Sequence, residues 1–83
     1  MRLEYIKEGE FKRLAQMKVL EGILAQESSK TPNKFHLIGV SFSQQVHYAV
    51  RAGRTNTLRE WRMDNLVVLV KSLGLSEIQV RFV

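Results

Sequence analysis

The chain has 83 residues, 45% of them hydrophobic and 25% charged, which is ordinary for one small globular domain and argues against a disordered chain. It contains no cysteine, which excludes disulfide frameworks, cysteine–zinc sites and thiol chemistry. The net charge of +5 favours polyanionic partners, with nucleic acid first among them.

The sequence shows neither a membrane segment nor a secretory signal. No apolar run approaches the roughly 18 residues that a membrane-spanning helix needs. Residues 1–11, MRLEYIKEGEF, carry charges throughout and have no apolar h-region. Because the lack of cysteine also fits a reducing compartment, we expect a cytoplasmic protein that does not bind membranes.

The first part of the chain is predicted to be helical. In residues 10–26, apolar side chains recur at steps of three and four, as on one face of a helix, at Leu14, Met17, Leu20 and Leu24. Residues 3–6 fit either a first helical turn or a short strand. The predicted single domain, residues 1–83, therefore begins with a helical arm over residues 1–27.

A loop and three strands are predicted to follow this arm. Residues 28–34 are rich in Ser, Thr and Asn and contain the only proline, so they form the loop that leads into a compact core over residues 35–83. Residues 35–42, 46–52 and 57–61 alternate with period two, which predicts three antiparallel strands in a meander.

The register of this meander follows from keeping apolar residues on one face, because a slip of one residue exchanges the faces. Loops of three residues, Ser43–Gln45 and Gly53–Thr55, meet that condition. The cross-strand pairs that result are Phe42–Val46, Val40–Tyr48, Ile38–Val50 and Val50–Leu58.

A second helix and a last strand complete the expected fold. Residues 64–73 carry the helical apolar pattern, with Asp64 as the N-cap and Gly74 as the terminator. Residues 77–83 alternate as a strand. The expected architecture is α+β with the order α-β-β-β-α-β, in which an antiparallel three-stranded meander and a C-terminal strand pack against one or two helices.

The predicted register leaves one sheet face away from the second helix, and the first helix decides what that face does. The residues on it are Leu37, Gly39, Ser41, His47, Ala49, Arg51, Thr57, Arg59 and Trp61. If the first helix packs there, the face is a second core layer, Gly39 and Ala49 give the helix room, and the arginines extend at its rim. We favour this arrangement over an open, basic platform.

A basic run at the second predicted hairpin is the candidate binding site. Arginine forks suit phosphate oxygens, and an exposed ring can stack on a base. The candidate nucleic-acid-binding residues are Arg51, Arg54, Arg59, Arg62, Trp61 and His47. The expected function is that of a small basic domain that binds DNA or RNA or acts in regulation. The alternative is a protein-interaction module or a homodimer without a nucleic-acid role.

Catalysis, metals and cofactors are not expected. Ser41 and His47 are opposite each other in the predicted register, but no carboxylate is placed to orient the histidine, so a hydrogen-bonded cross-strand pair is the favoured interpretation. Two histidines without a carboxylate cluster are too few for a metal site. No phosphate loop or dinucleotide motif occurs, so the sequence predicts a protein that is not an enzyme.

Overall fold

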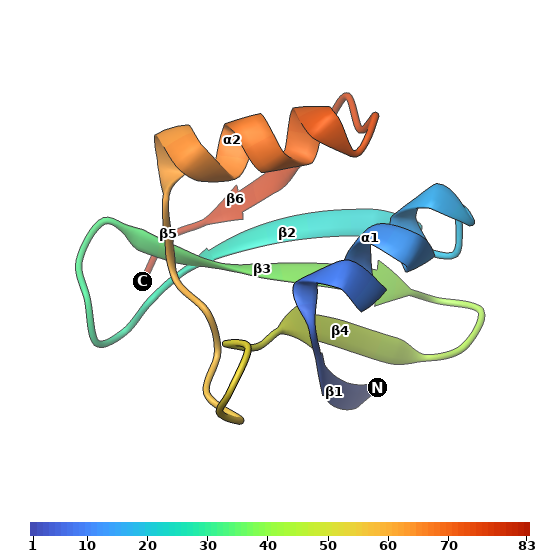
Figure 1. Cartoon of the computed structure of the whole chain (residues 1–83), viewed down its shortest axis with the longest axis horizontal. Coiled ribbons are helices and arrows are strands. Elements are labelled where there is room, and N and C mark those ends of the chain that lie inside the picture. Colours follow the sequence, from blue (N-terminus) through green and yellow to red (C-terminus); the bar gives the residue numbers. More distant parts are fainter.

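The computed structural model describes residues 1–83, which form two helices and one mixed six-stranded sheet (Figure 1). In chain order the elements are β1 (Arg2–Ile6), α1 (Glu8–Gln16), β2 (Gly22–Glu27), β3 (Lys34–Ser41), β4 (Val46–Val50), β5 (Trp61–Arg62), α2 (Met63–Ser72) and β6 (Gln79–Arg81). The strand order is β1-β4-β3-β2-β6, and β5 pairs with β3 outside this row.

The strand directions confirm the α+β class and correct its details. β1 runs parallel to β4, and β6 runs parallel to β2. The pairs β2–β3 and β3–β4 are antiparallel. An antiparallel meander of three strands therefore exists, but β2, β3 and β4 form it, one strand earlier in the chain than predicted, and the sheet is mixed.

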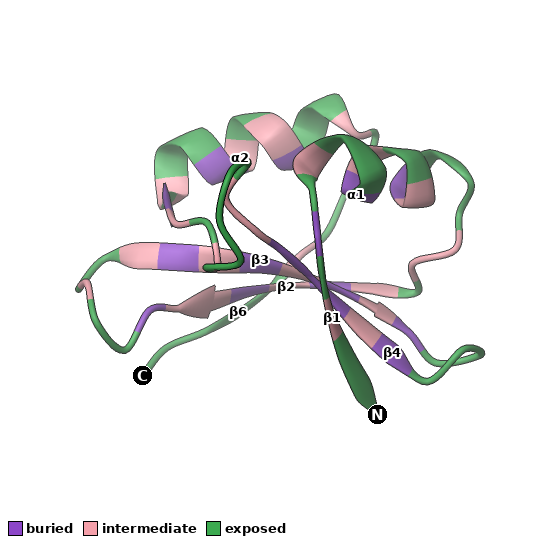
Figure 2. Ribbon diagram, turned by 60° about the horizontal axis from the view of Figure 1, so that its bottom comes forward, coloured by how far each residue is buried: buried purple, intermediate pink, exposed green.

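Both helices pack on the same face of the sheet, and the hydrophobic core lies between the helices and the sheet (Figure 2). Its largest fully buried apolar side chains are Phe11, Leu37, Leu66, Val46 and Val50. Gly39 of β3 lies under this layer: a Cβ atom there would be 2.9 Å from the Phe11 ring and 2.8 Å from a Leu20 methyl group. A residue without a side chain is what lets α1 and the chain after it approach the sheet this closely.

The helix predicted over residues 10–26 is wrong in its second half, where the chain forms β2. Buried Ile23 and Ala25 alternate with half-buried neighbours, which is the pattern of a strand. Gly22 weakens the helical alternative, and β2 gains hydrogen-bonded partners on both sides, β3 and β6. Residues 3–6, which fitted two interpretations, belong to a strand, β1.

The hairpin between β3 and β4 lies one residue away from the predicted register. Ser41 pairs with Val46, so the connection is Phe42–Gln45, one residue longer than predicted. Buried Ser41 accepts the Gln44 N–H at 3.3 Å and so holds the turn in this register. As a result, the set of β3 residues that includes Ser41 faces the helices, and Phe42, predicted as core, is 61% exposed.

The third strand predicted over residues 57–61 does not form. Leu58 makes one isolated bridge, with Arg51 rather than with Val50. The chain then leaves β4 and pairs through β5 with β3. Trp61 accounts for this path, because its large ring is only 7% exposed and its burial under the helices stabilises the crossing to β3.

The last two elements agree with the predictions over residues 64–73 and 77–83, with shorter bounds for the strand. Gly74 has a φ of 78° and follows the helix end, as the sequence predicted. Asp64 is in the first turn of α2 and is not its cap, because Arg62 occupies that position. β6 extends the sheet beside β2.

Candidate functional site

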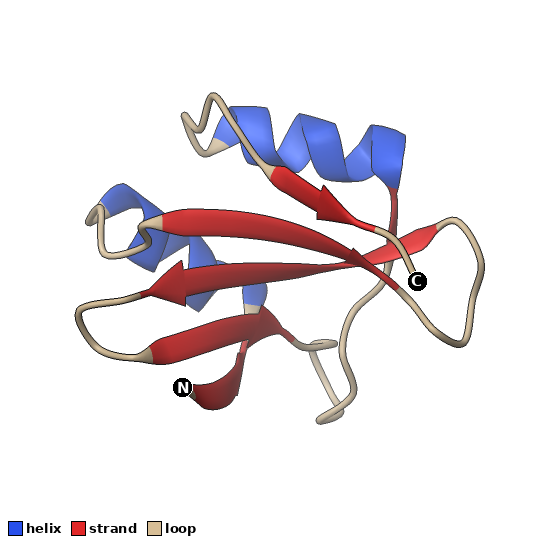
Figure 3. Cartoon of the chain, turned by 180° about the vertical axis from the view of Figure 1, so that it is seen from behind, coloured by secondary structure: helices blue, strands red, loops and turns tan.

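The sheet face opposite the helices has no helix over it, as the view from behind shows (Figure 3). Residues along a strand alternate between faces, and cross-strand partners share a face, so the observed registers assign every position. We define the open face as Leu3, Tyr5, Gly22, Leu24, Gln26, Lys34, His36, Ile38, Val40, His47, Ala49, Arg51, Leu58, Arg62, Gln79 and Arg81.

The open face has an apolar middle and a basic periphery. Leu24, Ile38 and Val40 are partly exposed in its centre. On the edge strand β1, Leu3 is 53% and Tyr5 37% exposed. Cationic side chains and imidazoles complete the face at Lys34, His36, His47, Arg51, Arg62 and Arg81. None of its strand positions is Asp or Glu, so the positive groups on the face have no acidic strand neighbour there.

The structure separates Trp61 and Arg59 from this face. Trp61 pairs with Phe35 and is buried on the helix side of the sheet, so it is not an exposed stacking platform. The Arg59 guanidinium lies 4.8 Å from the centre of the Trp61 ring, a cation–π contact, and also forms an ion pair with Glu8 of α1. These contacts tie the segment before β5 to α1.

The other predicted residues are dispersed. Arg62 forms an ion pair with Asp64 at 3.1 Å, and Arg54 is exposed in the loop after β4. Arg51 and His47 lie together on the open face, and Arg62 is at its margin opposite Lys34. The predicted Ser41–His47 pair does not occur, because His47 lies opposite Val40 and the Ser41 side chain is on the other face.

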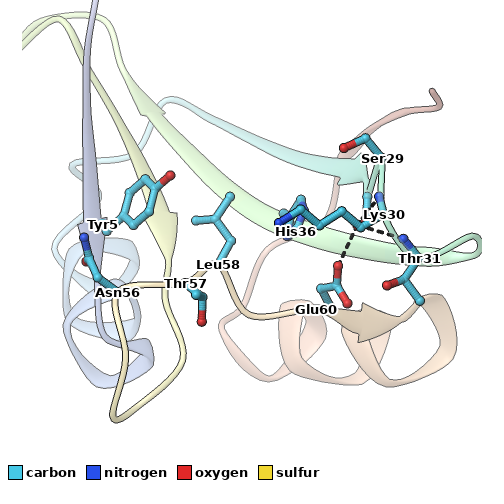
Figure 4. Close-up of a pocket in the computed structure, with 10 residues that line it drawn as sticks. Tyr5, Ser29, Lys30, Thr31, His36, Asn56, Thr57, Leu58 and Glu60 are labelled. Atoms are coloured by element: carbon cyan, nitrogen blue, oxygen red, sulfur yellow. Dashed lines mark hydrogen bonds between the residues drawn. The ribbon is translucent and has the colours of Figure 1, made fainter.

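A polar pocket of about 520 Å³ borders the open face (Figure 4). It lies where the loop after β2 and the segment before β5 flank the start of β3. The residues that line it are Tyr5, Ser28, Ser29, Lys30, Thr31, His36, Asn56, Thr57, Leu58 and Glu60. Three of them, Tyr5, His36 and Leu58, also belong to the open face, so the two surfaces are continuous.

Hydrogen bonds hold the walls of this pocket. The buried Ser28 hydroxyl donates to Glu60 at 2.6 Å and accepts the N–H groups of Lys30 and Thr31. The Ser28 hydrogen bond is the main reason that the pKa of Glu60 lies below its usual 4.5, so the carboxylate is ionised at neutral pH. The Nδ1 atom of His36 is 3.1 Å from the Arg59 carbonyl oxygen, which leaves Nε2 available to the pocket.

Sequence reasoning missed several members of this surface. Tyr5 and Arg81 lie on strands at opposite edges of the sheet, and no local pattern places them on one face. Lys34 and His36 were hidden by the one-residue error in register, which put their side of β3 toward the core. The alternation in residues 22–27 was the one available signal that a further strand, β2, lay between β3 and β6.

The chain matches no protein-family model and no curated protein. Neither helix is long and apolar enough to cross a membrane. No three His, Asp or Glu side chains cluster in a way that could hold a metal ion. The open face and its pocket are therefore interpreted from their own chemistry.

Proposed function

We propose that the protein binds single-stranded nucleic acid on the open face. The observation that carries this proposal is a sheet face without a helix over it, whose strand positions combine rings, cations and apolar side chains and include no carboxylate. A sheet of this kind suits unstacked bases, which lie flat on aromatic side chains while their phosphates contact basic groups around them.

The stacking groups are Tyr5 and the two imidazoles of the face. Tyr5 lies opposite Ala49, and His47 is opposite Leu3, so Tyr5 and His47 are diagonal neighbours on adjacent strands. Neighbouring strands lie about 4.7–4.9 Å apart, so large side chains at diagonal positions on one face can reach the same ligand. Ala49 between them is fully buried, so a base would contact the exposed parts of Tyr5 and His47 and not the sheet beneath them.

The phosphate-binding groups lie around this centre. Arg51 follows β4, and Arg81 ends β6 on the other side of the sheet. Lys30 extends the basic surface into the pocket. Arg59 and Arg62, which the sequence suggested for this role, are already paired with carboxylates, so we assign them to the framework of the protein.

The experiment is fluorescence anisotropy with labelled single-stranded DNA and RNA oligonucleotides and with a duplex of equal length, each at two salt concentrations. We expect single strands to bind more tightly than the duplex and binding to weaken as salt rises. Arg51→Gln and Arg81→Gln should each reduce the slope of log affinity against log salt by about 0.7. Tyr5→Leu should weaken binding about fivefold or more, because it removes a stacking ring, with little change in that slope.

Arg13→Gln is the matched control, because it removes the same charge from an exposed position of α1, on the helix side of the molecule. It should change the affinity much less than Arg51→Gln does. Undetectable binding at low salt would exclude the proposal. Equal losses in Arg13→Gln and Arg51→Gln would show a general charge effect and not a site on the open face.

A further inference from the structure

The outer edge of β1 has no partner strand. β1 ends the strand order and pairs only with β4. Arg2 donates its N–H to the Gln45 carbonyl oxygen at 3.0 Å, and the Ile6 carbonyl oxygen accepts the Arg51 N–H at 2.8 Å. Because alternate residues of a strand turn toward the same neighbour, Arg2, Glu4 and Ile6 bond to β4, and Leu3 and Tyr5 direct their N–H and C=O groups outward.

This edge lacks the usual protections against a second strand. Free edges are commonly blocked by proline, a bulge or a lone charged residue that repels a copy of itself. β1 has neither a proline nor a bulge. Its two charged residues, Arg2 and Glu4, lie on the same face and form an ion pair, with the Arg2 Nη2 atom 2.9 Å from the Glu4 Oε1 atom. On the other face, Leu3 is 53% exposed.

We propose that two copies of the chain associate through their β1 edges, antiparallel and centred on Leu3. The outward groups of one strand must meet those of the other, which restricts the pairing to registers centred on a residue. Centring on Arg2 or on Glu4 places like charges opposite each other, and centring on Tyr5 places Glu4 opposite the apolar Ile6, where it has no cation. Centring on Leu3 instead places Arg2 opposite Glu4 of the second copy, twice by symmetry, and Leu3 opposite Leu3.

This arrangement is self-complementary on both faces of the joined sheet. On the helix side, the four charges of the two copies alternate in sign, and cross-strand pairs of opposite charge stabilise a ladder. On the other side, the Leu3 side chains cover each other, and the two open faces become one surface. A two-fold axis perpendicular to the sheet relates the copies, as in a closed symmetric dimer.

The test exchanges the charges. Arg2→Glu makes this stretch of the edge all acidic, and Glu4→Arg makes it all basic, so each variant alone should dimerise at least about tenfold more weakly than the wild type in analytical ultracentrifugation. A one-to-one mixture of the two variants should form a heterodimer, because each Glu then meets an Arg. The double variant, Arg2→Glu with Glu4→Arg, should dimerise again.

Hydrogen exchange supplies a second measurement. The Leu3 amide should become protected as the wild-type concentration rises, and it should stay unprotected in Arg2→Glu. Circular dichroism checks that each variant is folded, which we expect because Arg2 is exposed and Glu4 is only half-buried. A wild type that is monomeric at high concentration, single variants that dimerise normally, or a mixture that stays monomeric would each overturn the proposal. These measurements contain no nucleic acid, so they are independent of the function proposed above.

Discussion

Replacing Gly39 with alanine tests the account of how α1 reaches the sheet. The added Cβ atom would lie 2.8 and 3.0 Å from the two methyl carbons of Leu20 and 2.9 Å from the Phe11 ring. Leu20 is half-buried, so its flexible side chain can yield more easily than a fully buried one. Phe11 is fully buried in the core, so its ring moves only if α1 shifts with it.

The expected cost is set by two opposing effects. Overpacking a core by one carbon atom typically costs about 1–3 kcal/mol. Alanine also restricts the unfolded chain more than glycine does, which returns about 0.4–1 kcal/mol. We therefore expect Gly39→Ala to lower the free energy of unfolding by about 1 kcal/mol. Gly22→Ala is the matched control on the adjacent strand, where the nearest atom, the Val40 Cβ, is 4.0 Å away, and it should be neutral or stabilise by about 0.5 kcal/mol.

Urea unfolding followed by far-ultraviolet circular dichroism measures both effects. With a slope of about 1 kcal/mol per molar urea, as expected for a small domain, the midpoint of Gly39→Ala should fall by about 1 M. The midpoint of Gly22→Ala should stay or rise. If Gly39→Ala is as stable as the wild type, or if both variants lose stability equally, the close packing of Phe11 and Leu20 over position 39 does not require a glycine there.

Two further predictions concern the segment before and within β5. Because the pKa of Glu60 is lowered, mainly by Ser28, its contribution to stability is complete above the usual 4.5 and is lost as the pH falls through the lowered value. The stability advantage of the wild type over Glu60→Gln, from urea midpoints, should therefore shrink between about pH 7 and about pH 3, and a constant difference would contradict this. Trp61→Ala should lower the free energy of unfolding by about 3–5 kcal/mol and Trp61→Phe by much less, whereas equal small losses would mean that the ring is not part of the core.

The sequence predicts those elements whose local signals agree with their packing. The second helix has both an apolar stripe and Gly74 at its end, and it forms almost as predicted. β3 and β4 also lie where alternation places them. Residues 22–27 differ, because Leu20 and Leu24 fit a helical spacing while Ile23 and Ala25 fit a strand. Pairing with β3 and β6 selects the strand over the helix, and this pairing cannot be predicted from the local sequence pattern.

The candidate site was predictable only in part, for a related reason. Arg51 and His47 occupy the open face because they lie on the side of β4 away from Tyr48, as alternation predicts. The size of the Trp61 ring favours burial as an anchor at the strand–helix junction, and the structure buries it, although its place beside arginines made it a candidate for binding. The hydroxyl of Ser41, which holds the hairpin turn, set the register that apolar matching alone assigned incorrectly.

The two parallel pairs of strands also govern how the chain folds. Arg2 pairs with Val46 and Leu24 with Gln79, so both edges of the sheet join segments that are far apart in the sequence. The loop-closure entropy of these contacts must be overcome before their hydrogen bonds form. The β2–β3–β4 meander is the part of the sheet with short connections, and we expect it to form first. The edge strands should add late, and the protein should fold more slowly than helical bundles and faster than all-β barrels of similar size.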